Sequence, residues 1–467
     1  MRYLSTRGDA PVLDFEGAML AGLARDGGLY VPERWPSLPA EAIGALAGAP
    51  YEAAAAEILA PFLGAGEGAL APAALQAMAT RAYAAFAHPA RAPLIQIGDN
   101  DWILELHRGP TLAFKDFAMK LIGQLFEASL TAQGRRATII GATSGDTGSA
   151  AMEAFRGLDA ADVFILYPHG RVSEVQRRQM TTPAEPNVHA LAIEGSFDDC
   201  QALVKAMFND FAFRDRLGLA AVNSINWARV AAQVVYYFTA AVALGAPGRA
   251  VSFSVPTGNF GDIYAGWTAQ RMGLPIERLV IATNENDILH RAMESGVYQP
   301  QGVRRTSAPS MDIQVSSNFE RALADAYDRD AGAVSALMAD LKTEGAFTIA
   351  PEPLARLRAA FDSARISEAE VAAEIKRVHD ETGEVIDPHT AIGVAAGRAR
   401  RGDPRTPMIA LGCAHAAKFP DAVAAACGAH PALPPHLSDL NERPERFTVL
   451  PNALDAVEAH IDGAARR

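Results

Sequence analysis

Short apolar runs alternate with segments of helical spacing from about residue 93 onward, and this alternation restricts the fold more than any other feature. Most of the runs are followed by a turn of Gly, Ser or Asp and then by a helical pattern. This rhythm is typical of buried parallel strands, so we predict an α/β fold with doubly wound parallel sheets. Ligands of such sheets bind beyond the carboxyl ends of the strands. The predicted strands are 93–97, 137–141, 162–167, 188–193, 250–255, 278–283 and 408–411.

The length of the chain sets limits on its organisation. At 467 residues it is too long for one core, so two or three domains are expected. We predict a mostly helical N-terminal domain over residues 1–92, with helices near 52–59 and 72–86, and a catalytic region over residues 93–467. Within the catalytic region we expect a smaller mobile lobe at about 110–235, a large lobe, and an extension at about 285–380 that lies over the site, with helices at 335–344 and 367–382.

The net charge and the cysteines argue against several classes of protein. A net charge of −12 disfavours nucleic acid as a partner, because phosphate backbones need a basic face. Cys200, Cys413 and Cys427 form neither a disulfide framework nor a zinc spacing, so we expect no metal and a cytoplasmic location. The sequence starts without the apolar region of a signal peptide and contains no run of about 18 apolar residues, so no membrane partner is expected.

The stretch TLAFKDFAMK, residues 111–120, contains the main chemical candidate, Lys115. A single lysine is usually a solvated surface residue. Here two Gly-rich loops follow it, TSGDTG at 143–148 and PTGNFGD at 256–262. An amine that can form a Schiff base, together with two loops that can bind anions, is typical of a pyridoxal phosphate enzyme. A Schiff base needs a neutral amine, so we expect Lys115 in an apolar setting, with Asp116 directed elsewhere.

Three further features could take part in binding or chemistry. Each Gly-rich loop leads from a predicted strand to a helix, where backbone N–H groups can bind a phosphate; taken singly, each also fits a capped β–α turn. Asn223, Ser224 and Arg229 could bind a second anion, although alone they fit a helix N-cap with a surface arginine. Cys413 follows the last strand, where it could contact a cofactor or be an inert buried thiol.

Seven stretches of the sequence match a known family in the same order. The chain resembles the threonine synthase family, which consists of fold type II pyridoxal phosphate enzymes, in its branch with a longer N-terminal domain and a long insertion. The matching stretches are YLSTRG at 3–8, DGGLYVPE at 26–33, HRGPTLAFKDFAMK at 107–120, TSGDTGSAA at 143–151, NSINWAR at 223–229, PTGNFGD at 256–262 and AHAAKFP at 414–420.

The resemblance implies a tryptophan synthase β-like architecture and a role for each matching residue. Lys115 would be the catalytic residue and would hold pyridoxal 5'-phosphate as a Schiff base. The other cofactor-binding residues would be Phe114, Asp146, Gly258, Asn259, Phe260, Gly261, Asp262 and Cys413. The substrate-binding residues would be Thr111, Thr143, Ser144, Asp146, Thr147, Asn223, Ser224 and Arg229.

The implied reaction converts O-phospho-L-homoserine and water to L-threonine and phosphate, the last step of threonine biosynthesis, in a monomer or homodimer. Two positions depart from the common pattern. Cys413 stands where the family usually has a threonine beside the pyridine nitrogen. Asp146 stands where many fold type II enzymes have an asparagine, and a carboxylate can donate a hydrogen bond only when it is protonated.

Other functions remain open at this point. A phospho-lyase that makes 2-oxobutyrate would use the same substrate, and a hydroxy-amino-acid dehydratase would share the fold. A catalytically silent ligand-binding relative is an alternative of another class, against which Lys115 and the two loops argue. A nucleotide-binding Rossmann protein is disfavoured, because no G-x-G-x-x-G pattern follows a strand with an acidic residue about 20 positions later.

Overall fold

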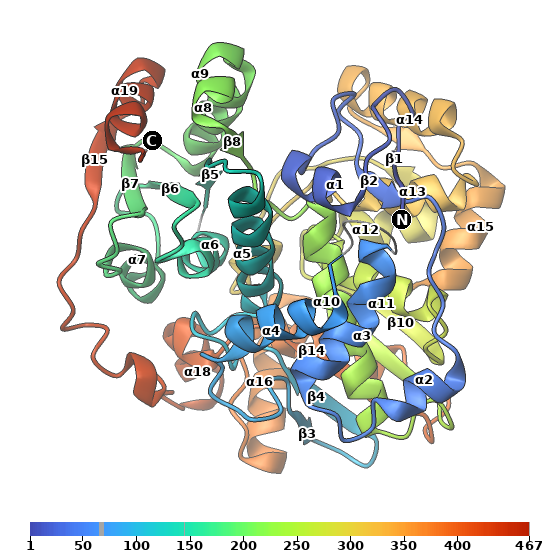
Figure 1. Ribbon diagram of the computed structural model, residues 1–467. Helices are drawn as coiled ribbons and strands as arrows, with labels where there is room; N and C mark the ends of the chain where they lie inside the picture. Colours follow the sequence, from blue (N-terminus) through green and yellow to red (C-terminus); the bar gives the residue numbers. More distant parts are fainter. Residues whose placement is uncertain (65–69, 144, 467) are drawn as a thin grey trace.

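The protein contains two sheets of mainly parallel strands, each covered by helices on both faces (Figure 1). The structure is a computed structural model that describes residues 1–64, 70–143 and 145–466. The predicted α/β class with parallel sheets is confirmed. Each of the seven predicted strand segments overlaps a strand of the structure.

The larger sheet has the strand order β13-β10-β9-β14-β4-β3. All neighbours run parallel except β3 and β4, which run antiparallel because residues 97–100 alone connect them, too few for a crossover. The segment 93–97 is therefore an edge strand of a hairpin and not part of the parallel array. The strands of this sheet are β3 (Leu94–Gln96), β4 (Asp101–Glu105), β9 (Val251–Pro256), β10 (Ile276–Thr283), β13 (Asp362–Arg365) and β14 (Met408–Gly412).

The smaller sheet has the order β15-β7-β6-β5-β8, with all neighbours parallel. The edge strand β15 comes from the carboxyl end of the chain, beyond the range 110–235 predicted for the smaller lobe. Figure 1 shows this return of the chain in red. The strands are β5 (Ala137–Ala142), β6 (Ala161–Pro168), β7 (Val188–Glu194), β8 (Leu219–Ala220) and β15 (Thr448–Pro451). Two antiparallel pairs complete the set: β1 (Tyr3–Ser5) with β2 (Tyr30–Pro32), and β11 (Val297–Tyr298) with β12 (Phe347–Thr348).

The helices include those predicted at 52–59, 72–86, 335–344 and 367–382. They are α1 (Phe15–Ala21), α2 (Ala40–Ala45), α3 (Tyr51–Leu63), α4 (Pro72–Tyr83), α5 (Lys115–Ala132), α6 (Asp146–Phe155), α7 (Glu174–Thr181), α8 (Phe197–Asn209), α9 (Phe211–Leu217), α10 (Trp227–Ala243), α11 (Gly261–Arg271), α12 (Ile288–Ser295), α13 (Phe319–Ala326), α14 (Ala331–Thr343), α15 (Pro351–Ala360), α16 (Glu368–Thr382), α17 (Pro388–Ala399), α18 (Pro420–Cys427) and α19 (Leu454–Ala464). Short 3₁₀ turns include η1 (Pro309–Met311), η2 (Ala416–Lys418) and η3 (Pro435–Leu437). Among the described residues, no helix is both long and apolar enough to cross a membrane.

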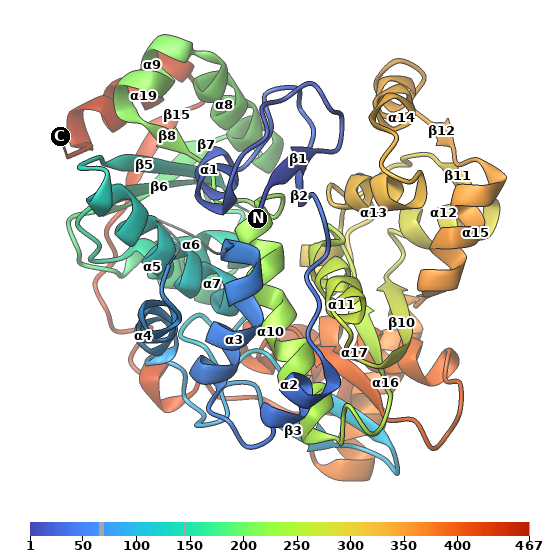
Figure 2. The same cartoon turned by 45° about the vertical axis from the view of Figure 1, so that its right-hand side comes forward.

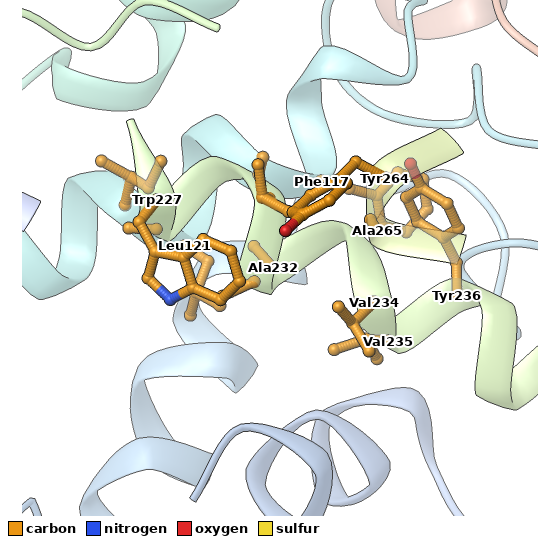
Figure 3. Close-up of a cluster of buried hydrophobic side chains, with 14 of the residues drawn as sticks. Phe117, Leu121, Trp227, Ala232, Val234, Val235, Tyr236, Tyr264 and Ala265 are labelled. Carbon is orange, nitrogen blue, oxygen red and sulfur yellow. The ribbon is translucent and has the colours of Figure 1, made fainter. Parts of the chain in front are cut away.

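Helix α10 forms the centre of the main hydrophobic core. It lies between α5 and α11 in the turned view of Figure 2, and nearly all of its side chains are buried. Figure 3 shows Trp227 and Tyr236 of α10 packed with Phe117 of α5 and Tyr264 of α11. The N-terminal segment joins the same core, because the ring of Tyr3 lies 5.9 Å from that of Trp227. Since α10 starts directly after the 223–226 loop, this packing determines the position of that loop.

The segment at 285–380 is anchored through a buried arginine. Arg321 of α13 is fully buried, and burial lowers the pKa of its guanidinium to about 10. Its Nε donates to the carbonyl of Tyr30 at 3.1 Å and its Nη2 to the carbonyl of Ile225 at 2.6 Å. It also bonds the side chain of Asn318. Arg321 thus connects helix α13 both to the N-terminal strand pair and to the loop that precedes α10.

Replacing this arginine tests its importance. Arg321→Leu should lower the free energy of unfolding by about 3–5 kcal/mol, because three buried acceptors lose their donor. Urea denaturation followed by circular dichroism measures the change. Arg135→Leu, at an exposed position, serves as the control and should change stability by less than about 0.5 kcal/mol. Equal stability of the two variants would contradict this role of Arg321.

Candidate active site

Several helix N-termini converge on one cavity. Lys115 begins α5, Asp146 begins α6 and Gly261 begins α11, while Arg229 lies in the first turn of α10. Backbone N–H groups at such termini are free and carry partial positive charge, so the cavity favours anions. Of the residues predicted for the site, the cavity is lined by Phe114, Lys115, Asp146, Thr147, Ser224, Arg229, Gly258, Asn259, Phe260, Gly261, Asp262 and Cys413.

Lys115 is a buried residue that lines this cavity. Its Nζ lies 3.5 Å from Oδ2 of Asp146 and 5.0 Å from the ring centre of Phe114. Burial lowers the pKa of its amine, while Asp146 acts in the opposite direction. The neighbouring cations Lys418 and Arg229 lower the pKa further. The site therefore favours the neutral, reactive amine that the sequence required at this position.

Asp116 points away from Lys115, as expected. Its two oxygens accept hydrogen bonds from the backbone N–H and the hydroxyl of Thr111, at 2.8 and 2.6 Å. Burial raises the pKa of Asp116 to about 6, and these bonds from Thr111 act in the opposite direction. Thr111 itself does not line the cavity. Its hydroxyl donates to Asp116, so in this structure Thr111 supports the turn before Lys115, and its role in substrate binding stays a prediction.

The loop over residues 256–262 has the geometry of an anion site. None of the described residues accepts a hydrogen bond from the backbone N–H groups of Gly258, Asn259 or Phe260. Phe260 has φ of 63°, a left-handed conformation that a non-glycine residue adopts at a cost of about 1–3 kcal/mol. A Cβ on Gly258 would lie 3.2 Å from the carbonyl oxygen of Ser310. Free donors in a strained, closely packed loop before a helix fit a phosphate group.

Asp262 closes the inner end of the same loop. Its Oδ1 accepts from the hydroxyl groups of Tyr236 and Tyr237 at 2.5 and 2.9 Å. Its Oδ2 is buried without a partner among the described residues. Burial raises the pKa of this carboxyl to about 6, against the lowering effect of the two tyrosines. An unpaired buried oxygen in a cavity wall is a place where a bound ligand can supply the missing contact.

Cys413 lies in the cavity wall directly after β14. Its Sγ is 3.6 Å from the carbonyl oxygen of Leu411, a weak contact, and its N–H donates to the hydroxyl of Thr390 at 3.2 Å. Burial raises the pKa of the thiol well above its usual value. The thiol is therefore neutral and inert as a nucleophile, and it presents a weak donor and acceptor to the cavity.

Arg229 is a buried cation with no carboxylate partner among the described residues. It is 4% exposed, and burial lowers the pKa of its guanidinium to about 10. Its Nη1 donates to the carbonyl oxygen of Val222 at 3.3 Å. Ser224 lines the cavity with it, whereas Asn223 is exposed and does not. A buried charge without a counter-ion is unfavourable unless a ligand neutralises it, so Arg229 favours an anionic ligand here.

The loop at 143–148 contributes unevenly to the site. Thr147 lines the cavity. The hydroxyl oxygen of Thr143 instead accepts from the N–H groups of Gly145 and Gly148, at 3.0 and 2.9 Å, and so shapes the loop. Ser144 falls outside the described residues.

Sequence reasoning missed several residues of the site and its surroundings, including Ser310 and Met311, and three of the missed residues bear on its chemistry. Gln233 lines the cavity one turn after Arg229, but its position within a buried helix carries no chemical signal. His389 donates from Nδ1 to Asp387 at 2.6 Å and accepts from the N–H of Ser310 at 3.3 Å, yet its sequence DPHT resembles a simple capped helix start. Lys418 lies within the matched stretch 414–420 and is fully buried, with its Nζ 2.6 Å from Oδ1 of Asp146.

Comparisons with known proteins agree with this geometry. Models of protein families match residues 2–83 as "Threonine synthase N terminus", residues 88–340 as "Pyridoxal-phosphate dependent enzyme" and residues 390–461 as "Threonine synthase, C-terminal". A threonine synthase of Pseudomonas aeruginosa is 52% identical over 468 residues, covering 100% of this chain and 99% of its own length. The chain belongs to the threonine synthase family.

Solved structures of threonine synthases extend the comparison to the fold. The enzyme from Brucella melitensis, described as bound to pyridoxal phosphate, superposes with a TM-score of 0.97 at 56% identity, covering both chains completely. Threonine synthase from yeast gives 0.94 at 39% identity, over 99% of this chain and 98% of its own. The predictions of a fold type II enzyme, of pyridoxal phosphate as the cofactor and of a lyase of threonine biosynthesis are confirmed.

The buried acid of this threonine synthase site should make stability depend on pH. The pKa of Asp262 is raised from 3.8 to about 6, so its contribution to stability is complete at low pH and is lost as pH rises through about 6. Asp262→Asn removes this titration. From about pH 5 to pH 8, the unfolding free energy of Asp262→Asn should therefore rise by about 1–2 kcal/mol relative to that of the parent protein.

Urea denaturation of the cofactor-free protein at both pH values measures this difference. Asp421→Asn, at an exposed position of α18, is the matched control and should follow the parent protein. A constant difference between Asp262→Asn and the parent at both pH values would contradict the raised pKa.

Proposed function

We propose that the chain converts O-phospho-L-homoserine and water to L-threonine and inorganic phosphate. The observation that carries this proposal is the pair of separate anion sites in one cavity. The loop at 256–262 offers free N–H groups, and Arg229 offers an unpaired buried charge. A cofactor phosphate occupies only one of them, so the second favours a substrate that carries a phosphate of its own.

The residues present fit pyridoxal phosphate. Lys115 would hold it covalently through its amine, residues Gly258 to Asp262 would bind its phosphate, and Phe114, Asp146 and Cys413 would line its ring. When bound, this cofactor supplies an electron sink for negative charge at the substrate carbon that carries the amino group. The weak thiol of Cys413 gives no strong support to a protonated ring nitrogen.

The protein side chains transfer protons and bind the substrate. Lys115, with its amine kept neutral by burial, removes the proton from the substrate α-carbon and returns protons at later stages. Arg229 and Ser224 hold the substrate phosphate and retain it after its release. The resemblance assigns Thr143, Ser144, Asp146 and Thr147 to the surroundings of the substrate α-carboxylate and the cofactor's phenolic oxygen, and of these Asp146 and Thr147 line the cavity. Asn223 and Thr111, which the resemblance assigns to the substrate phosphate, do not line the cavity.

Location, assembly and domain division are part of the same proposal. Cys200, Cys413 and Cys427 are free thiols, which supports a reducing cytoplasm. The sequence-based predictions of a monomer or homodimer, and of a domain boundary at about residue 92, are kept as part of this proposal. Among the described residues, no group of His, Cys, Asp and Glu is arranged to hold a metal ion.

A product assay separates synthase from phospho-lyase. Purified holoenzyme with O-phospho-L-homoserine should release threonine and phosphate in equal amounts. Phosphate with 2-oxobutyrate would assign the chain to the phospho-lyases, and a cofactor-loaded protein that releases neither would be a silent relative. Lys115→Ala should reduce turnover at least about 1,000-fold, since no other amine lines the described cavity. Retained turnover would contradict the role of Lys115.

Arg229→Ala tests the phosphate site. Substrate binding should weaken by about 2–5 kcal/mol, seen as a raised KM, because the phosphate loses a buried charged partner. Inorganic phosphate should lose its inhibition in the same variant. Arg135→Ala, at an exposed position, is the matched control. Unchanged KM and unchanged phosphate inhibition in Arg229→Ala would place the phosphate elsewhere.

A further inference from the structure

A second buried lysine lies behind the cavity. Lys418 ends η2, in the segment between β14 and α18, and its side chain is completely buried. Its Nζ is 2.6 Å from Oδ1 of Asp146 and donates to the carbonyl oxygen of Thr111 at 2.8 Å. It does not line the cavity, so these two partners connect it to the residues that do.

Asp146 therefore lies between two lysines. Its Oδ2 faces Lys115 at 3.5 Å, and its Oδ1 faces Lys418 and also accepts from Nε2 of Gln176 at 2.7 Å. Burial acts to raise the pKa of this carboxyl, but Lys418 and then Lys115 outweigh burial and hold it well below its usual range. Asp146 is thus a carboxylate and cannot donate a hydrogen bond, which distinguishes it from an asparagine at this position.

The second partner connects Lys418 to the start of α5. The carbonyl of Thr111 accepts from Lys418 and from Gln179, while its N–H and hydroxyl donate to Asp116. Lys418 thereby joins the turn before Lys115 to the aspartate in front of it. This lysine contacts both groups that determine where the Lys115 amine lies and which charge it faces.

We propose that Lys418 is a positioning residue that engages the Asp146 carboxylate and so prevents it from pairing exclusively with Lys115. The shorter contact, 2.6 Å against 3.5 Å, belongs to Lys418. Without Lys418, the carboxylate would have Lys115 as its one remaining cation at this distance and would hold that amine as an ammonium. The inference rests on the proposed function only in assigning the reactive amine to Lys115.

The charged and titratable groups that face Lys115 come from several elements. They are Asp146 of α6, Lys418 of η2, Arg229 of α10 and Cys413 after β14. Two of them are cations, and Asp146 is an anion. Removing Lys418 subtracts a positive charge and releases a negative one, so both effects favour protonation of the Lys115 nitrogen.

The test is a pH titration of the holoenzyme without substrate, followed by the absorbance of the cofactor bound to Lys115. In Lys418→Met the midpoint should rise by about one pH unit or more, as for loss of a nearby charge. Lys418→Arg, which keeps the charge, should restore most of the parent value. Lys376→Met makes the same substitution at an exposed site of α16 and should leave the midpoint unchanged.

A double variant keeps the test decisive if Lys418→Met fails to fold. Because Lys418 acts mainly through Asp146, the midpoint of Asp146→Asn/Lys418→Met should differ from that of Asp146→Asn only by the small direct effect of the lost lysine charge, less than about half a unit. A midpoint difference of more than about half a unit between these two variants, or an unshifted midpoint in folded Lys418→Met, would overturn the inference. A parent protein that shows no cofactor band attached to Lys115 would instead overturn the role of Lys115 in the proposed function.

Discussion

The ion pair between Lys418 and Asp146 is the contact on which the arrangement of the site depends. It joins two buried side chains that are 272 positions apart in the chain, at a distance of 2.6 Å. A buried charge is tolerated only when it is paired, and here one carboxylate serves two lysines. Through Thr111 the same lysine holds the start of α5, so loop 143–148, the Lys115 turn and the segment after β14 are fixed relative to one another.

Several helix N-termini and buried polar side chains surround this ion pair. Arg229 and Oδ2 of Asp262 lack a counter-charge or donor among the described residues, and Phe260 adopts a strained left-handed conformation. Such features destabilise a protein unless a ligand completes them. All of these features lie in one cavity. There they lower the stability of the empty protein and at the same time favour the binding of an anion.

The segment at 285–380 shows how packing far from the chemistry shapes the site. Its strand β13 extends the larger sheet, its turn η1 brings Ser310 and Met311 to the cavity, and Arg321 connects it to the N-terminal strands and the loop before α10. His389 adds a further link, since it accepts a hydrogen bond from the backbone of Ser310. The segment thus contributes Ser310 and Met311 to the cavity wall.

The α/β class and the positions of seven strands could be predicted from apolar periodicity and Gly-rich turns, because these are local patterns, and the matching family motifs indicated most of the cavity residues. Only the tertiary structure decided which side chains meet. It placed Thr111 behind Lys115 and Asn223 at the surface, brought strand β15 into the smaller sheet, and revealed Lys418 as the partner of Asp146. These outcomes depend on contacts between distant segments, where burial and charge pairing act across space and leave no regular spacing in the chain.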